Sequence, residues 1–126
     1  MSRTRHCEIE RSFTFEAAHR LPQLPADHKC HRMHGHSFRV TVRVRGPIDP
    51  ELGWVVDFAR LEEAWRPLHR QLDHNVLNEV PGLENPTSEM VALWILERFA
   101  VEGAEISSVY VAETCRSACT VFASTP

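Results

Sequence analysis

The stretch HGHSFRVTVRVRG, residues 34–46, alternates between apolar and polar side chains over most of its length. From residue 37 to residue 45, the odd-numbered positions carry basic or hydroxylated side chains. The even-numbered positions carry apolar side chains, namely Phe38, Val40, Val42 and Val44. Successive side chains of a strand point to opposite faces of its sheet, so this period of two is typical of a strand with one buried face. Residues 34–46 therefore predict a half-buried strand that defines the core side of a sheet.

A second strand is predicted upstream, in IERSFTFEAAH, residues 9–19. Its apolar side chains again share one parity, which His19 continues; they are Ile9, Phe13, Phe15 and Ala17. Residues 20–33 connect the two strands and contain Cys30. Because a connection of this length inside a compact domain is usually functional, we expect it to contribute to a site.

Two helices are predicted downstream. In DFARLEEAWRPLHRQLDH, residues 57–74, apolar side chains recur at spacings of three and four, which is typical of an amphipathic helix. Pro67 lies inside that pattern and is expected to kink the helix or to end it early. In PGLENPTSEMVALWILERFA, residues 81–100, Thr87 can cap a second helix and Glu89 favours its first turn.

Two closing strands are predicted in AEISSVYVAE, residues 104–113, and ACTVFAS, residues 118–124. The predicted order is thus strand, strand, helix, helix, strand, strand. This order is typical of an α+β domain, in which the apolar faces of the helices are buried against an antiparallel sheet. The sequence therefore predicts an α+β domain with an antiparallel sheet covered by helices.

The composition predicts one globular domain: the chain has 126 residues, and 43% of them are hydrophobic. A formal net charge of -3 argues against a nucleic-acid-binding surface. No apolar run approaches the roughly 20 residues of a membrane span, and the N-terminal stretch lacks the apolar segment of a signal peptide. We therefore expect a cytoplasmic protein with reduced cysteines, available for catalysis or metal binding: Cys7, Cys30, Cys115 and Cys119.

Three histidines are candidates for a metal site. His34 and His36 lie on the parity of the apolar face, and His19 lies on the matching parity of the preceding strand. If the two strands pair antiparallel, the three imidazoles converge at one end of the sheet. Three neutral imidazoles with an open position are common in catalytic zinc sites. Iron or another divalent ion would fit the same ligands, but zinc is favoured because imidazole suits it and no redox chemistry is required.

Cys30 admits two interpretations. It could be the fourth ligand of a closed structural site, because three residues separate it from His34. Alternatively, it lies beside the metal and acts as a base or nucleophile. The pair Asp73 and His74 could relay protons to such a thiol, although a histidine at a helix C-terminus is also stabilised by the helix dipole alone.

Glu113 ends the apolar row of a predicted strand. A carboxylate there could accept hydrogen bonds from two adjacent N–H groups, such as the edge of a guanine or pterin ring. From physical chemistry alone, an exposed residue at a strand end is the favoured interpretation. Cys115 and Cys119 form a C-x3-C pair without further ligands nearby, which favours turn or packing residues.

Six motifs in this order resemble the 6-pyruvoyl-tetrahydropterin synthase family, and most closely its bacterial queuosine-pathway branch. They span almost the whole chain and are FTFEAAHRL (13–21), C-x3-HGHSF (30–38), GWVVDF (53–58), LDHNVLN (72–78), ENPTSE (84–89) and ETC (113–115). The resemblance implies a tunnelling fold (T-fold) over a single domain, residues 1–126, with a four-stranded antiparallel sheet and two helices on one face in the order ββααββ. It also implies a homo-oligomer in which trimers close their sheets into a barrel, two trimers commonly stack into a hexamer, and pockets form between subunits.

The resemblance further implies a role for each candidate residue: zinc ligands His19, His34 and His36, a catalytic thiol Cys30 with relay partners Asp73 and His74, and a pterin anchor Glu113. The implied activity is a zinc-dependent carbon–oxygen and carbon–carbon lyase. Its implied substrate is 7,8-dihydroneopterin triphosphate, and the products are 6-carboxy-5,6,7,8-tetrahydropterin, acetaldehyde and triphosphate in queuosine biosynthesis. The implied partner is thus a small pterin, with no direct contact to nucleic acid or membrane.

Two alternatives remain open at the level of sequence. The first is the 6-pyruvoyl-tetrahydropterin synthase activity of the animal enzymes, which resemble a longer C-x5-HGH pattern than the C-x3-HGH found here. The second, from another class, is a zinc-stabilised binding module without catalysis. A module of that kind predicts a coordinatively closed site and unfolding on chelation.

Overall fold

The structure is a computed structural model that describes residues 4–114 and 116–124. Its elements follow the predicted order, with two short 3-10 helices added in the connections. They are β1 (His6–His19), η1 (Lys29–His31), β2 (His34–Pro47), α1 (Phe58–Leu72), η2 (Leu77–Glu79), α2 (Ser88–Arg98), β3 (Glu105–Glu113) and β4 (Ser117–Phe122). The predicted α+β class and element order are confirmed.

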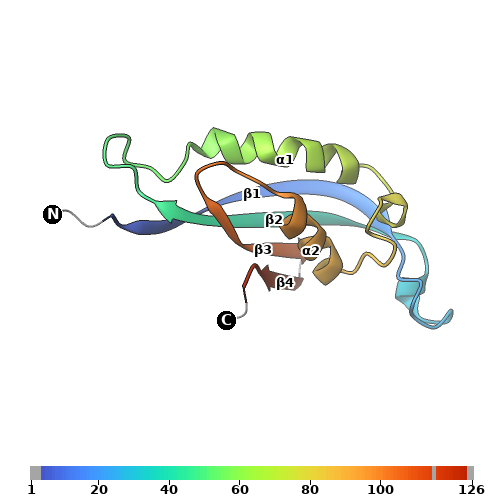
Figure 1. Ribbon diagram of the computed structural model, residues 1–126. Coiled ribbons are helices and arrows are strands. Elements are labelled where there is room, and N and C mark those ends of the chain that lie inside the picture. The colour runs from blue at the N-terminus through green and yellow to red at the C-terminus, as the bar shows by residue number, and fades with distance from the viewer. Residues whose placement is uncertain (1–3, 115, 125–126) are drawn as a thin grey trace.

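The four strands form one antiparallel sheet in the order β1-β2-β3-β4 (Figure 1). Helix α1 packs over β1, and α2 packs over β3 and β4. The pairing of β1 with β2 sets Phe15 opposite Phe38 and His19 opposite His34. This register aligns the two apolar parities on the same face, as the sequence predicts.

The core lies between that face and the helices. Phe15 and Phe38 stack with ring centroids 4.7 Å apart, and Trp65 of α1 stacks on Phe13 at 4.9 Å. The valines of β2 are fully buried, whereas Arg39 on the opposite parity is exposed. Burial of aromatic and branched side chains is the main stabilising contribution to such a layer, and it fixes the side of the sheet on which His34 and His36 lie.

Helix α2 begins where its capping residue predicts, whereas helix α1 continues past its internal proline. Thr87 caps α2 by accepting a hydrogen bond from the Met90 N–H, as predicted. Helix α1 continues to Leu72, five residues beyond Pro67, so the expectation of an early end is wrong. A proline costs a helix about 3 kcal/mol, but the burial of Leu68 and Leu72 on the core side offsets this cost.

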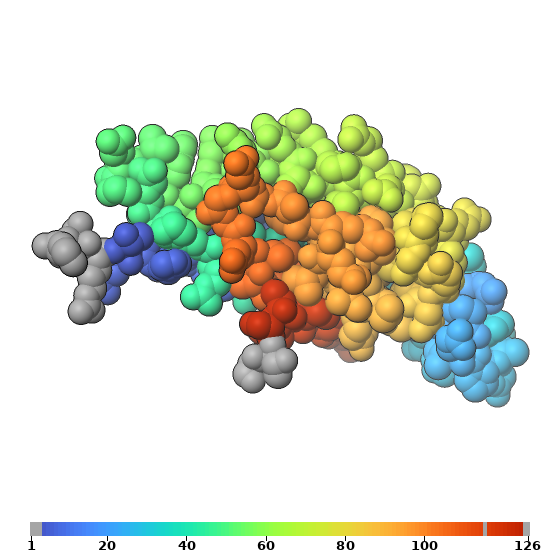
Figure 2. Space-filling model, in the orientation of Figure 1, coloured from blue at the N-terminus to red at the C-terminus, as the bar shows by residue number. Residues whose placement is uncertain are grey.

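Two connections meet the sheet at the end that carries the histidines. Residues 20–33 project beyond the sheet, and Figure 2 shows them as a protrusion at one end of the molecule. Residues 73–76 run beside the end of β1, since the His74 N–H donates to the Glu16 carbonyl and the Ala18 N–H donates to the Asn75 carbonyl. In the described part of the chain, no helix combines the length and apolar character needed to cross a membrane.

Candidate metal centre and active site

His19, His34 and His36 converge at one end of the sheet, as their parities predict. The register sets His19 opposite His34, and His36 follows two positions along β2 on the same face. Their ring centroids lie 4.6 to 5.2 Å apart, and one nitrogen from each ring falls within 4.8 Å of the others. This spacing is compatible with three imidazoles around one ion.

Each of these rings is held through its Nδ1 atom. His19 Nδ1 lies 2.8 Å from the Pro86 carbonyl, and His34 Nδ1 lies 2.7 Å from the Arg32 carbonyl. A carbonyl oxygen only accepts, so both Nδ1 atoms carry the proton and both Nε2 atoms keep their lone pairs. This arrangement is typical of metal-binding histidines, whose second nitrogen is oriented by an acceptor.

The environment of His19 tests whether a metal fits. His19 is 1% exposed, and its Nε2 is buried without a hydrogen-bond partner. Burial lowers the pKa of His19, so its imidazole is neutral near pH 7. A buried lone pair without a partner is costly unless something coordinates it, and a metal ion among the three rings would do so.

Glu113 lies directly beside this cluster. Its Oε2 is 3.1 Å from His36 Nε2, and its Oε1 accepts a hydrogen bond from Ser88 at the start of α2. The side chain is 22% exposed, so it is not the freely exposed strand-end residue that physical chemistry alone favoured. A carboxylate held in this way can accept hydrogen bonds from a ligand that also reaches the metal centre.

Asp73 and His74 form an oriented pair just after α1. His74 Nδ1 lies 2.8 Å from Asp73 Oδ2, while Asp73 Oδ1 accepts from the Glu16 N–H at 2.9 Å. The Glu16 N–H, together with His74, lowers the pKa of Asp73, and the hydrogen bond that His74 donates to Asp73 raises the pKa of His74. His74 has a φ of 57°, a conformation rare outside glycine and often found at functional sites.

His74 and His36 line the same cavity, of about 590 Å³. Glu16, Ser37 and Thr114 also line it, so it borders both the metal cluster and the Asp73–His74 pair. The size is sufficient for part of a small ligand. The structure thus brings the pair and the histidine cluster to one hollow, although they lie far apart in sequence.

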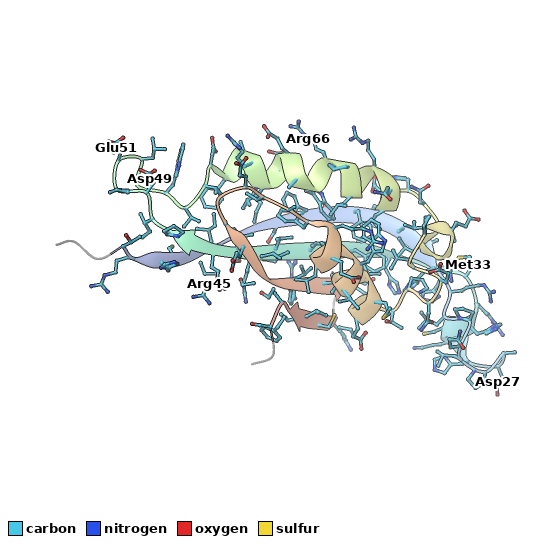
Figure 3. The ribbon with its side chains drawn as sticks, in the orientation of Figure 1. Asp27, Met33, Arg45, Asp49, Glu51 and Arg66 are labelled. Atoms are coloured by element: carbon cyan, nitrogen blue, oxygen red, sulfur yellow. The ribbon has the colours of Figure 1, made fainter. Side chains whose placement is uncertain are left out.

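Cys30 is placed differently. It belongs to η1 in the projecting connection, which Figure 3 traces from the tip at Asp27 to its return at Met33. Within the described residues, the metal-compatible group consists of the three histidines, and Cys30 is not among them. Nor does a hydrogen bond join the Cys30 thiol to His74 in that part of the chain. A closed site with Cys30 as fourth ligand is therefore not supported by the geometry of the single chain.

The structure describes one member of the C-x3-C pair. Cys115 lies outside the described residues. Cys119 is half-buried in β4, and burial raises the pKa of its thiol, which disfavours the reactive thiolate.

Replacement of Asp73 by asparagine is expected to lower the pKa of His74 toward its ordinary value of 6.5. The aspartate stabilises the imidazolium through a hydrogen bond and through charge, so its neutralisation favours the unprotonated ring. NMR titration of the His74 ring measures the change.

The matched control is Asp49→Asn. The pKa of Asp49 is also lowered by backbone N–H groups, but Figure 3 shows this residue at the opposite end of the molecule from Met33. The Asp49→Asn substitution is expected to leave the titration of His74 unchanged. An unaltered pKa of His74 in the Asp73→Asn variant would contradict the assigned pairing.

Sequence reasoning missed several residues that complete the site. Ser88 directly follows the predicted cap Thr87, and Thr114 directly follows Glu113, so both stand inside recognised motifs without an assigned role. Glu16, in the motif of β1, accepts a hydrogen bond from Ser37 and holds Asp73 through its backbone N–H. Their positions in motifs were an available signal, but their contacts depend on the fold.

Comparison with known proteins gives consistent matches. The family model described as 6-pyruvoyl tetrahydropterin synthase matches residues 8–124. A 6-carboxy-5,6,7,8-tetrahydropterin synthase from Synechocystis sp. is 46% identical over 122 residues, covering 90% of this chain and 92% of the relative. A dihydroneopterin monophosphate aldolase from Pyrococcus furiosus is 38% identical over 85 residues, covering 68% of both chains. The solved structure of 6-pyruvoyl tetrahydropterin synthase from Caenorhabditis elegans aligns with a TM-score of 0.87 at 28% identity, covering 98% of this chain and 100% of that one.

Proposed function

The chain belongs to the 6-pyruvoyl tetrahydropterin synthase family and has its T-fold, and from this premise we propose that it is a zinc-dependent 6-carboxy-5,6,7,8-tetrahydropterin synthase. In the proposed reaction, 7,8-dihydroneopterin triphosphate and one water give 6-carboxy-5,6,7,8-tetrahydropterin, acetaldehyde and triphosphate. The product would enter queuosine biosynthesis. The observation that carries the proposal is the Glu113 carboxylate 3.1 Å from His36 Nε2, which sets a ring anchor beside a three-histidine centre.

The metal would be held by His19, His34 and His36 through their Nε2 atoms. When bound, zinc supplies a Lewis acid beside the substrate side chain. The hydrogen bonds at Nδ1 orient the rings of His19 and His34 for this purpose, since each ring must offer its other nitrogen to the ion. Three nitrogen ligands leave a coordination position open for substrate, which is the pattern of a catalytic site.

Glu113 is the proposed ring anchor. A carboxylate has two oxygens, and together they can accept hydrogen bonds from adjacent N–H groups of a pterin. Ser88 donates to Oε1 and so fixes the plane of the carboxylate before the substrate arrives. An anchored ring holds its side chain toward the histidine centre, and such positioning accelerates a reaction by reducing the entropy lost at the transition state.

Cys30 and the Asp73–His74 pair are the proposed proton-transfer groups. Asp73 keeps the proton of His74 on Nδ1, so Nε2 is the atom that exchanges protons with a reacting group. Cys30 lies in the projecting connection, and among the described residues it does not line the cavity that His36 and His74 share. We therefore place the complete site between copies of a trimer-based homo-oligomer, where Cys30 of one copy meets the pair of a neighbour.

Product analysis tests the proposed function. The zinc-loaded protein is incubated with 7,8-dihydroneopterin triphosphate, and the products are identified by mass spectrometry. The expected result is the 6-carboxy product with an equal amount of acetaldehyde. A parallel incubation with 7,8-dihydroneopterin monophosphate is expected to show no comparable turnover.

Other products would support a different activity for this protein. A 6-pyruvoyl product would contradict the proposed branch and support the activity named for the Caenorhabditis elegans protein. Preferred cleavage of the monophosphate would support the activity named for the Pyrococcus furiosus relative. No consumption of either compound by a folded, zinc-loaded protein would favour a binding module.

A further inference from the structure

His36 differs from the other two clustered histidines in how its ring is held. The Nδ1 atoms of His19 and His34 contact backbone carbonyls, which side-chain substitution does not remove. The Nδ1 of His36 instead lies 2.7 Å from the hydroxyl oxygen of Thr114. Among these three rings, His36 is the one whose Nδ1 contacts a side chain. That side chain, Thr114, directly follows β3, whereas His36 lies in β2.

Thr114 also has an unusual backbone conformation. Its φ is 48°, in the left-handed region that β-branched residues seldom occupy. Its N–H donates to the Ser37 carbonyl at 2.8 Å, which ties the residue to β2 directly beside His36. Strained backbone of this kind persists where the surrounding structure requires it, and it is concentrated at functional sites.

The position of His36 gives the contact a chemical consequence. Its Nε2 faces Glu113 Oε2 at 3.1 Å, and the ring lines two hollows, one with His74 and one with Arg116. His36 is only partly buried, so packing restrains its ring less than that of His19. When the Thr114 hydroxyl accepts the Nδ1 proton of the neutral ring, Nε2 keeps its lone pair and can bind a metal ion.

We propose that Thr114 is a positioning residue whose hydroxyl fixes the ring and tautomer of His36 for metal binding. This inference rests on the metal centre of the proposed function, but it does not depend on which pterin reaction the protein catalyses. Thr114 acts through His36, and no contact of Thr114 with substrate is required.

The test is the zinc affinity of three variants, measured by competition with a chromophoric chelator in the absence of substrate. Thr114→Val keeps the shape of the side chain and removes the hydroxyl, and it is expected to weaken zinc binding by about 10- to 100-fold. Thr114→Ser restores the hydroxyl and is expected to bind zinc within about threefold of the wild type. NMR of the His36 ring nitrogens reports the tautomer in each variant.

Thr114→Gly separates the hydroxyl from the backbone strain. Glycine adopts a positive φ without steric cost, so this variant is expected to fold with an unchanged or higher melting temperature while binding zinc as weakly as Thr114→Val. Wild-type affinity in Thr114→Val and Thr114→Gly would overturn the proposal. Equal weakening in Thr114→Ser and Thr114→Val would also overturn it, because the hydroxyl would then have no role. Because no substrate is used, a failed product assay leaves this result interpretable.

Discussion

An equimolar mixture of the Cys30→Ala and His74→Ala variants is expected to recover about one quarter of the wild-type rate after the subunits exchange, although each variant alone is nearly inactive. Loss of a proton-transferring group costs about 10²- to 10⁴-fold in rate, so the background of each single variant is low. In the mixture, a site is intact when the chain that supplies Cys30 carries His74→Ala and the chain that supplies His74 carries Cys30→Ala. Random association gives that combination at about one site in four.

The reason for this expectation is the separation of the two groups in one chain. Cys30 lies in the connection that projects beyond the sheet, whereas His74 is held against β1 by Glu16 and Asp73. In the described part of the chain, no hydrogen bond joins the thiol to the imidazole. We therefore expect a site that needs both groups to take them from two copies.

Subunit exchange is achieved by coexpression, and native mass spectrometry confirms the hybrid oligomers. The matched control is a mixture of Asp73→Asn with His74→Ala, which is expected to stay inactive because both changes damage the same pair. If the Cys30 and His74 mixture also stays inactive in verified hybrids, the complete site lies within one chain. If Cys30→Ala instead loses zinc, the thiol is a metal ligand and the proton-transfer assignment is wrong.

Replacement of His34 by alanine is expected to abolish both zinc binding and turnover. His34 supplies one of the three converging nitrogens, and it is less buried than His19, whose removal would also leave a cavity beside Pro86. Bound zinc measured by elemental analysis is expected to fall to below about one tenth of the wild-type content, since two imidazoles hold a divalent ion poorly.

Stability gives a second measurement of the same change. A ligand present at 100 times its dissociation constant stabilises the folded state by about 2.7 kcal/mol. Chelation of zinc is therefore expected to lower the melting temperature of the wild type and to leave that of His34→Ala unchanged. A folded chelated wild type is expected, because most of the buried core lies along the sheet away from the three histidines, as far as Val44 and Trp65.

The control is His6→Ala, which removes an exposed imidazole from the other end of β1. It is expected to keep the zinc content, the melting temperature and the response to chelator of the wild type. Full zinc content in His34→Ala would contradict the assigned ligand set. Complete unfolding of the wild type on chelation would instead favour the structural zinc of a binding module.

The local sequence pattern was sufficient to predict the helices and strands and to predict which of their faces are buried. The alternation in residues 34–46 predicted both β2 and the side of the sheet on which His34 and His36 lie. The shared parity of His19 predicted the convergence of the three rings, and Thr87 marked the start of α2. These features depend on neighbours within a few positions along the chain, where side-chain direction repeats with a fixed period.

The partners of the site were decided by tertiary structure. His19 meets a carbonyl 67 positions away, and His36 meets the Thr114 hydroxyl 78 positions away. The continuation of α1 past Pro67 depends on core burial that periodicity does not measure. The place of Cys30, in a short 3-10 helix of the projecting connection, likewise follows from the path of that connection rather than from its composition. Sequence alone determined which side chains face the core and the metal centre, whereas strand register and loop path, set by packing across the whole sheet, decided which groups touch.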